Sequence, residues 1–189
     1  MTVNPVLIPI PGNDRGVAPR ERIARQRDAA ARALDESARL SGLPLLAWRR
    51  DEAGVPIFER GVCWSMSHKP ACACGVVSTA PVGIDVEIVE PRNEGLWGYV
   101  ATVEEQARAG PRDWETFFRF WTAKEAVLKM HRVGLARLES CRVVEGPDAC
   151  GALLTFDASP CRVWFHRTGY VLAALAGPSV APIWDLHSG

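Results

Sequence analysis

The sequence predicts an α+β fold in which two similar halves of one chain form a pseudo-dimer with a cleft between them. Helical periodicity followed by short apolar runs, which are typical of strands, occurs twice along the 189 residues. Pro91 and Arg92 interrupt the pattern between the two occurrences. We therefore expect an N-terminal half at residues 1–90 and a C-terminal half at residues 91–189.

The N-terminal half is expected to begin with an irregular arm, because residues 1–19 are rich in proline and show little periodicity. Alanine, leucine and arginine at helical spacing predict a helix over residues 20–40, which Gly42 and Pro44 end. Strands or extended segments are predicted after it at residues 43–48, 56–59, 62–67, 72–78 and 82–89. A turn over residues 67–70 is expected between the third and fourth of these segments.

The C-terminal half repeats this order. A weak helix is predicted over residues 96–108, and the pair Gly110-Pro111 ends it. Apolar residues at helical spacing predict a strong helix over residues 114–131, which ends near Gly134. Four strands are then expected, at residues 140–144, 152–156, 161–166 and 170–176.

Charge and hydropathy exclude several classes of protein. The 22 basic and 22 acidic residues give a formal net charge of zero, so no overall charge favours nucleic acid or an anionic membrane. No apolar run has the length of a membrane span. Residues 3–10 lack a charged leader and are interrupted by Pro5 and Pro9, which argues against a secretory signal. We expect a cytoplasmic protein that binds neither nucleic acid nor membranes.

The cysteines are expected to be reduced and mostly buried. None of the six forms a CxxC pair, and no histidine lies at zinc-ligand spacing from two of them. Without a secretory signal, free thiols are the favoured state. A metal site at Cys72 and Cys74 is the less favoured alternative, because further ligands are missing.

The segment that contains Asp85 and Glu87 is predicted to be a strand with two different faces. Ile84 and Val86 would point to one side, and the two acidic side chains would point together to the other. Like charges on one strand face repel unless a cation lies near them. The ordinary alternative is the solvated face of an edge strand.

A second charged pair, Glu125 and Lys129, would share one face of the helix over residues 114–131. The ordinary alternative is a stabilising helical ion pair. If the strand and helix meet, three hard oxygen ligands converge beside a lysine, which is what a magnesium ion that holds a phosphate ester requires. The sequence contains no Walker-type glycine loop, no GxGxxG fingerprint and no GxSxG elbow.

Three motifs in order resemble those of the 4′-phosphopantetheinyl transferases. They are WSMSH at residues 64–68, VGIDVE at residues 82–87 and FWTAKEAVLK at residues 120–129. Each motif is short, but three in order at compatible separations are specific. The resemblance covers roughly residues 20–176. It is greater to the surfactin-synthetase-activating (Sfp) type, whose two halves lie in a single chain.

The resemblance implies a reaction and its partners. The 4′-phosphopantetheine group of coenzyme A would be transferred to a serine of an apo acyl, peptidyl or aryl carrier protein, with release of adenosine 3′,5′-bisphosphate. Such a holo-carrier-protein synthase uses Mg²⁺, with Mn²⁺ as an alternative. A family member with both halves in one chain is expected to be a monomer.

The resemblance also implies residue roles. Asp85, Glu87 and Glu125 would bind the metal, Glu125 would also accept the serine proton, and Lys129 would neutralise phosphate charge. The residues expected to bind coenzyme A are Gly54, Val55, Pro56, Ser67, His68 and Lys124, with Arg25 and Arg32 from the first helix. Val55 is a departure, because the family often has lysine there. Arg25, Arg32 and Lys69 are candidates for the missing charge.

Two other functions use the same residues. One is a non-catalytic relative that only binds coenzyme A or a carrier protein. The other is a magnesium-dependent pyrophosphate hydrolase. Because three carboxylates and Lys129 are present together, the transferase is favoured over the simple binding protein.

Overall fold

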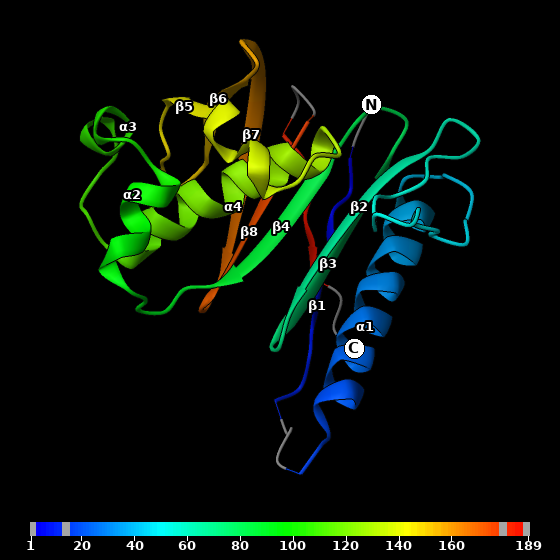
Figure 1. The fold of residues 1–189 in the computed structure, drawn as a ribbon. Coiled ribbons are helices and arrows are strands. Elements are labelled where there is room, and N and C mark those ends of the chain that lie inside the picture. The colour runs from blue at the N-terminus through cyan, green and yellow to red at the C-terminus, as the bar shows by residue number, and fades with distance from the viewer. Residues whose placement is uncertain (1–2, 13–15, 178–180, 187–189) are drawn as a thin grey trace.

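The α+β class is confirmed by a computed structural model, which describes residues 3–12, 16–177 and 181–186. Two sheets lie side by side, and one long helix packs against each of them (Figure 1). This arrangement is compatible with two similar halves, and the pseudo-dimer stays a prediction. Residues 1–2 and 13–15 of the expected N-terminal arm lie outside the described residues.

The first sheet has the strand order β2-β3-β1-β9. Its strands are β1 (Val6–Pro9), β2 (Cys63–Lys69), β3 (Cys72–Ser78) and β9 (Asp185–Leu186). Helix α1 (Pro19–Leu40) packs against this sheet through a face of alanine and leucine side chains. The approach is close at Gly75, where a Cβ atom would lie 2.6 Å from the backbone nitrogen of Leu34.

The second sheet is antiparallel, with the strand order β4-β8-β7-β6-β5. Its strands are β4 (Gly83–Ile88), β5 (Cys141–Glu145), β6 (Gly151–Phe156), β7 (Ser159–Thr168) and β8 (Val171–Ala176). Helix α4 (Trp114–Met130) covers it, and Asp113 caps the helix by accepting a hydrogen bond of 2.8 Å from the Thr116 amide. The remaining helical segments are η1 (Glu94–Leu96), α2 (Trp97–Val100), α3 (Val103–Arg108) and η2 (Leu135–Ser140).

A shared core joins the two sheets. Leu7 and Val76 of the first sheet belong to the same buried cluster as Ile84 and Leu175 of the second. The apolar side chains of β4 therefore face the first sheet. Because successive side chains of a strand point to opposite sides, the acidic side chains of β4 face α4.

The strong helical and strand patterns are confirmed. Helix α1 and helix α4 match the predicted helices to within one residue at each end, and β3 matches its predicted strand. The weak helix predicted over residues 96–108 is interrupted instead. There Thr102 starts a separate helix, α3, through a capping box with Glu105.

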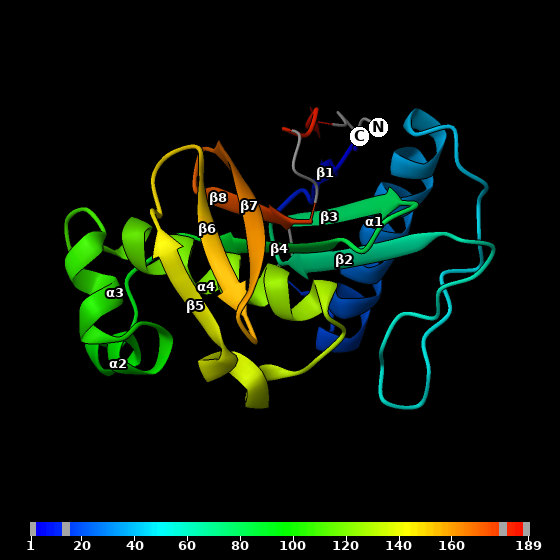
Figure 2. The same ribbon diagram turned by 90° about the horizontal axis from the view of Figure 1, so that it is seen from above.

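Three local predictions are wrong. Residues 43–48 form no strand and belong to a long loop. This loop lies beside the sheets, on the side where α4 ends (Figure 2). The expected turn over residues 67–70 is shorter, because β2 continues to Lys69 and only Pro70 and Ala71 form the turn. The arm contains strand β1, which is stabilised by pairing with β3, a distant segment that local periodicity does not reveal.

Sheet membership does not follow the expected division between residues 90 and 91. Strand β4 precedes the division but pairs with β8, and β9 follows it but pairs with β1. The division into two halves of the chain stays a prediction. The pairing shows that each sheet contains one strand from the other side of this division in the sequence.

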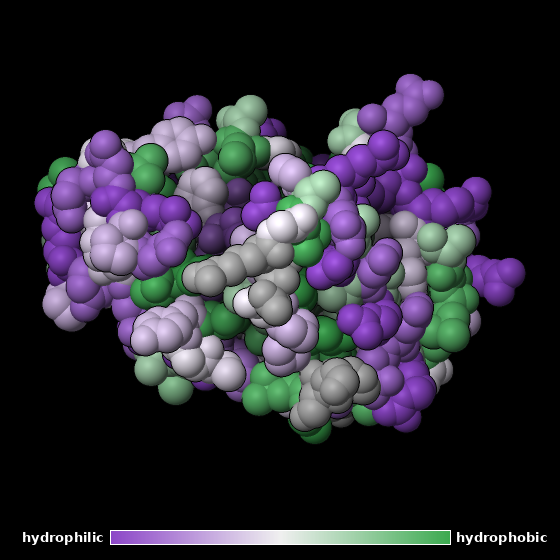
Figure 3. Space-filling view, turned by 90° about the horizontal axis from the view of Figure 1, so that it is seen from below, coloured by the Kyte–Doolittle hydropathy of each residue, from purple (hydrophilic) through white to green (hydrophobic). Residues whose placement is uncertain are grey.

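The structure has further features that bear on the class of protein. No helix within the described ranges is long and apolar enough to cross a membrane. On the face seen from below, hydrophobic residues lie in separate patches among hydrophilic ones (Figure 3). All six cysteines are free, as expected from the sequence.

The contact between β4 and α4 predicts a strong effect of Gly83→Ala. The added Cβ atom would lie 1.9 Å from the carbonyl oxygen of Ala126 and 2.5 Å from the backbone nitrogen of Met130. Because backbone must move, we expect the free energy of unfolding to fall by about 3 kcal/mol, measured by urea denaturation. Gly98→Ala is the control, since a Cβ atom there meets nothing within 4 Å. Equal stability of the two variants would contradict this close packing.

Candidate active site

Strands β2 and β4 run side by side (Figures 1 and 2). Polar side chains connect them. Ser67 Oγ donates a hydrogen bond of 2.8 Å to Asp85 Oδ1. Two residues further along both strands, Lys69 Nζ lies 2.7 Å from Glu87 Oε1. The acidic face of β4 therefore meets one face of β2 at the junction of the two sheets.

Helix α4 closes the other side of this acidic face. Lys129 Nζ lies 2.6 Å from Asp85 Oδ1, and Trp121 Nε1 donates a hydrogen bond of 2.9 Å to Glu87 Oε1. Glu125 lies four residues from each of these helical residues, so all three share one helix face. The predicted meeting of the two charged pairs is therefore present.

The acidic residues are close enough to change one another's pKa values. Burial raises the pKa of Glu125, and the negative charges of Asp85 and Glu87 raise it further. Burial also raises the pKa of Glu87, with a second contribution from Asp85. Burial alone would lower the pKa of Lys129, but the adjacent Asp85 carboxylate raises it above its ordinary value. These residues form one electrostatic unit, which we call the acid cluster: Asp85, Glu87, Glu125, Lys69 and Lys129.

The acid cluster has some, but not all, of the features of a metal site. Among the residues that the structure describes, no group of three or more His, Cys, Asp or Glu side chains is placed to hold a metal ion. Lys69 and Lys129 instead occupy one oxygen each of Glu87 and Asp85. However, Asp85 Oδ2 is buried and has no hydrogen-bond partner. A hard divalent cation fits such a carboxylate oxygen, which is costly to leave unpaired.

A cavity of about 360 Å³ begins beside Lys129. The loop residues Gly54, Val55 and Pro56, all predicted to bind coenzyme A, line it. Its opposite wall is the turn after α4, which includes Arg132. The cavity therefore connects these three loop residues with Lys129 of the acid cluster.

Ser67 and His68 lie on opposite faces of β2, because successive side chains of a strand alternate. Ser67 faces Asp85, whereas His68 Nδ1 lies 3.0 Å from Gln26 Oε1 of α1. Burial lowers the pKa of His68, and the positive charge of Arg27 contributes next. The two residues of the predicted Ser-His pair therefore have different surroundings.

The structure does not bring Arg25 and Arg32 to the acid cluster. Arg25 forms an exposed ion pair with Glu21, and Arg32 lines a separate surface hollow with Asp35. Both lie away from the buried face of α1, as their positions on a helix of 3.6 residues per turn require. Arg27, next to Gln26, is the arginine of α1 that influences His68.

Arg50 is a candidate residue that sequence reasoning missed. Its Nη1 atom donates a hydrogen bond of 2.7 Å to Gly54 O, and its guanidinium lies 5.4 Å from the ring centroid of Trp64. Burial lowers its pKa, and the positive charge of Arg27 lowers it further. It lines the same cavity as Lys129. Its position shortly before the Gly54-Val55-Pro56 turn was the signal in the sequence that could have identified it.

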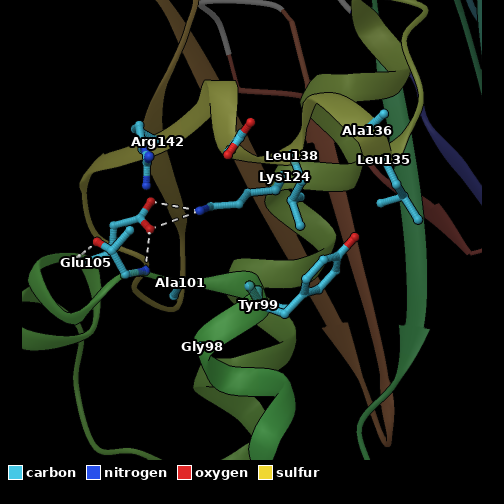
Figure 4. A pocket seen from close by; sticks show the side chains of 12 residues that line it. Gly98, Tyr99, Ala101, Glu105, Lys124, Leu135, Ala136, Leu138 and Arg142 are labelled. Atoms are coloured by element: carbon cyan, nitrogen blue, oxygen red, sulfur yellow. Dashed lines mark hydrogen bonds and ion pairs between the residues drawn. The ribbon is translucent and has the colours of Figure 1, made fainter.

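Lys124 points into a different cavity, of about 460 Å³, that also includes Tyr99 and Arg142 (Figure 4). Its Nζ atom lies 2.8 Å and 3.0 Å from the two carboxylate oxygens of Glu105, and both side chains are 3% exposed. Glu105 also accepts hydrogen bonds from the amides of Thr102 and Val143. This buried pair joins α3, α4 and β5.

Lysines gathered with acidic residues in one partly buried site can stabilise charge on a phosphate ester. Residues 81–175 match the 4′-phosphopantetheinyl transferase superfamily, and the chain belongs to this family. It is also 32% identical over 120 residues to the 4′-phosphopantetheinyl transferase HetI of Nostoc sp. (strain PCC 7120 / SAG 25.82 / UTEX 2576). That match covers 57% of this chain and 51% of HetI, so it spans about half of the relative.

The raised pKa of Glu125 predicts how Glu125→Gln changes stability. Because the pKa is higher in the folded than in the unfolded protein, the ionised carboxylate opposes folding at neutral pH, and this cost disappears below the ordinary carboxyl pKa. Without added divalent cations, the substitution should therefore increase the free energy of unfolding more at pH 7 than at pH 4. Urea denaturation at both pH values measures the difference.

Glu104→Gln is the control with the opposite sign. Hydrogen bonds from its own amide and from the Thr102 side chain hold the pKa of Glu104 below its ordinary value. Its ionised form therefore favours folding, and the substitution should destabilise the protein more at pH 7 than at pH 4. A pH-independent effect of Glu125→Gln would contradict the burial of an ionised Glu125.

Proposed function

We propose that this protein transfers the 4′-phosphopantetheine group of coenzyme A to a serine of an apo acyl, peptidyl or aryl carrier protein and releases adenosine 3′,5′-bisphosphate. The observation that carries the proposal is the acid cluster, in which Asp85 keeps one buried oxygen without a partner. We assign the protein to the surfactin-synthetase-activating type and expect it to act as a monomer, since β2, β4 and α4 of one chain form the whole cluster.

In the proposed reaction, the serine oxygen of the carrier protein attacks the phosphorus that bears pantetheine. A new phosphorus–oxygen bond forms, and the bond to the bridging pyrophosphate oxygen breaks. Glu125 accepts the serine proton, a role that its raised pKa favours. Lys129 stabilises the negative charge that develops on the phosphate oxygens and on the leaving bisphosphate.

Mg²⁺, with Mn²⁺ as an alternative, is the proposed metal. Asp85, Glu87 and Glu125 would hold it, and when bound it would neutralise pyrophosphate charge. Ser67 orients the Asp85 carboxylate through its hydrogen bond to Oδ1, which leaves Oδ2 directed elsewhere.

Two of the cavities suggest how coenzyme A would lie across the acid cluster. The adenosine end would occupy the cavity between Gly54, Pro56 and Lys129. The pantetheine arm would extend past Tyr99 toward the cavity that Lys124 lines. The pyrophosphate then lies between them, beside Lys129.

Transfer is tested with an apo carrier protein, a fluorescent coenzyme A analogue and Mg²⁺. We expect labelling by the wild type and at least about 100-fold slower labelling by Asp85→Asn, which loses the charge that holds both Lys129 and a cation. Asp28→Asn, at an exposed position of α1, is the control and should label normally. Full activity of Asp85→Asn would overturn the assigned site.

The same assay separates the alternative functions. A non-catalytic relative would bind coenzyme A, measured by calorimetry, without labelling any carrier protein. A pyrophosphate hydrolase would release adenosine 3′,5′-bisphosphate with no carrier protein present. Either result would replace the transferase proposal.

We further propose that Arg50 and Arg27, rather than Arg25 and Arg32, hold the 3′-phosphate of coenzyme A together with His68. Burial and then the positive charge of Arg27 lower the pKa of both Arg50 and His68, so the charges of Arg27 and Arg50 gather near His68. An anion is therefore favoured there. Arg50 is already oriented by Gly54 and Trp64.

This assignment predicts the effect of Arg50→Ala on two ligands. Coenzyme A should bind at least about tenfold more weakly, whereas dephospho-coenzyme A, which lacks the 3′-phosphate, should bind as it does to the wild type. Isothermal titration calorimetry measures both. Arg49→Ala is the matched control, because Arg49 pairs with Glu59 instead. Equal losses for both ligands would show that Arg50 does not contact the 3′-phosphate.

A further inference from the structure

Lys69 lies at the last position of β2, on the rim of the acid cluster. Its Nζ atom contacts Glu87 Oε1 at 2.7 Å, and the same oxygen accepts the hydrogen bond from Trp121 Nε1. The Glu87 side chain is only 7% exposed, but that of Lys69 is 35% exposed. The ammonium group therefore reaches a buried carboxylate from the solvent side.

Lys69 changes the charge that a divalent cation would meet. With all three carboxylates ionised, the two ammonium groups leave the acid cluster with one net negative charge, and without Lys69 it would carry two. Divalent cations bind carboxylates through charge attraction, so a nearby ammonium group opposes their binding. A metal ion bound at Glu87 would also compete with Lys69 for this carboxylate.

The surroundings of Lys69 give it room to leave Glu87. Together with Tyr99 and Phe118, Lys69 and Glu87 line a cavity of about 210 Å³. A lysine ammonium on a flexible four-carbon stem can move within such a space.

We propose that Lys69 couples the binding of a divalent cation to the binding of coenzyme A. In the free protein its ammonium group neutralises Glu87. When a cation binds Glu87, the ammonium group moves to a pyrophosphate oxygen of coenzyme A. Because both events require Lys69 to leave Glu87, each ligand increases the affinity for the other by the same factor. The inference rests on the proposed function, which supplies the pyrophosphate.

Mn²⁺ binding tests this coupling without any measurement of transfer. Free Mn²⁺ is measured by electron paramagnetic resonance, with and without saturating coenzyme A. We expect coenzyme A to tighten Mn²⁺ binding to the wild type at least about tenfold. Lys69→Met should bind Mn²⁺ about tenfold more tightly than the wild type when coenzyme A is absent, and should gain less from coenzyme A. Lys69→Arg keeps the charge and should remain close to the wild type.

Arg92→Met is the matched control, because Arg92 lines the same cavity but pairs with Glu90. It should not change Mn²⁺ affinity. Equal Mn²⁺ affinities of the wild type and Lys69→Met would overturn the inference, even if the wild type labels carrier proteins. Conversely, the expected Mn²⁺ behaviour without any labelling would count against the proposed transferase function alone.

Discussion

The position of the Asp85 carboxylate is the constraint on which the site depends. Only 4% of this residue is exposed, and both of its donors, Ser67 from the first sheet and Lys129 from α4, meet the same oxygen. Three elements from distant parts of the sequence are thereby fixed around one charged group. Because one oxygen receives both donors, the other is left unpaired. Packing of apolar residues would hold the elements together as well, but it would not leave a buried carboxylate oxygen without a partner.

The buried acids of the site reduce the stability of the folded protein. Burial raises the pKa of both Glu87 and Glu125, so their ionised forms are disfavoured in the folded protein. The two lysines offset part of this cost. By contrast, the buried pair of Lys124 and Glu105 is surrounded by further hydrogen bonds and lies apart from the acid cluster. The charges of the acid cluster are therefore only partly compensated. The pair of Lys124 and Glu105 instead connects α3, α4 and β5.

Local patterns in the sequence predicted the parts of the fold that depend on local periodicity. Helix α4 carries its own apolar stripe and cap, and the acidic face of β4 follows from strand alternation. The sheet that β4 joins depends on pairing with β8, which lies more than eighty residues later, so no local pattern reveals it. Arg25 and Arg32 were wrongly predicted to lie near the site for a similar reason. Which face of α1 is buried determines that Arg27, not Arg25, lies near His68.

The two-residue turn at Pro70 and Ala71 fixes the register of β2 against β3. That register decides which side chains of β2 meet the acids and which meet α1. Since neighbouring positions alternate, inserting a single residue between Lys69 and this turn would exchange the two sets, placing His68 toward the carboxylates and Lys69 toward the helix. A chain with one extra residue at this point would therefore need a compensating deletion or a bulge in β2 to keep the same side chains facing the acids.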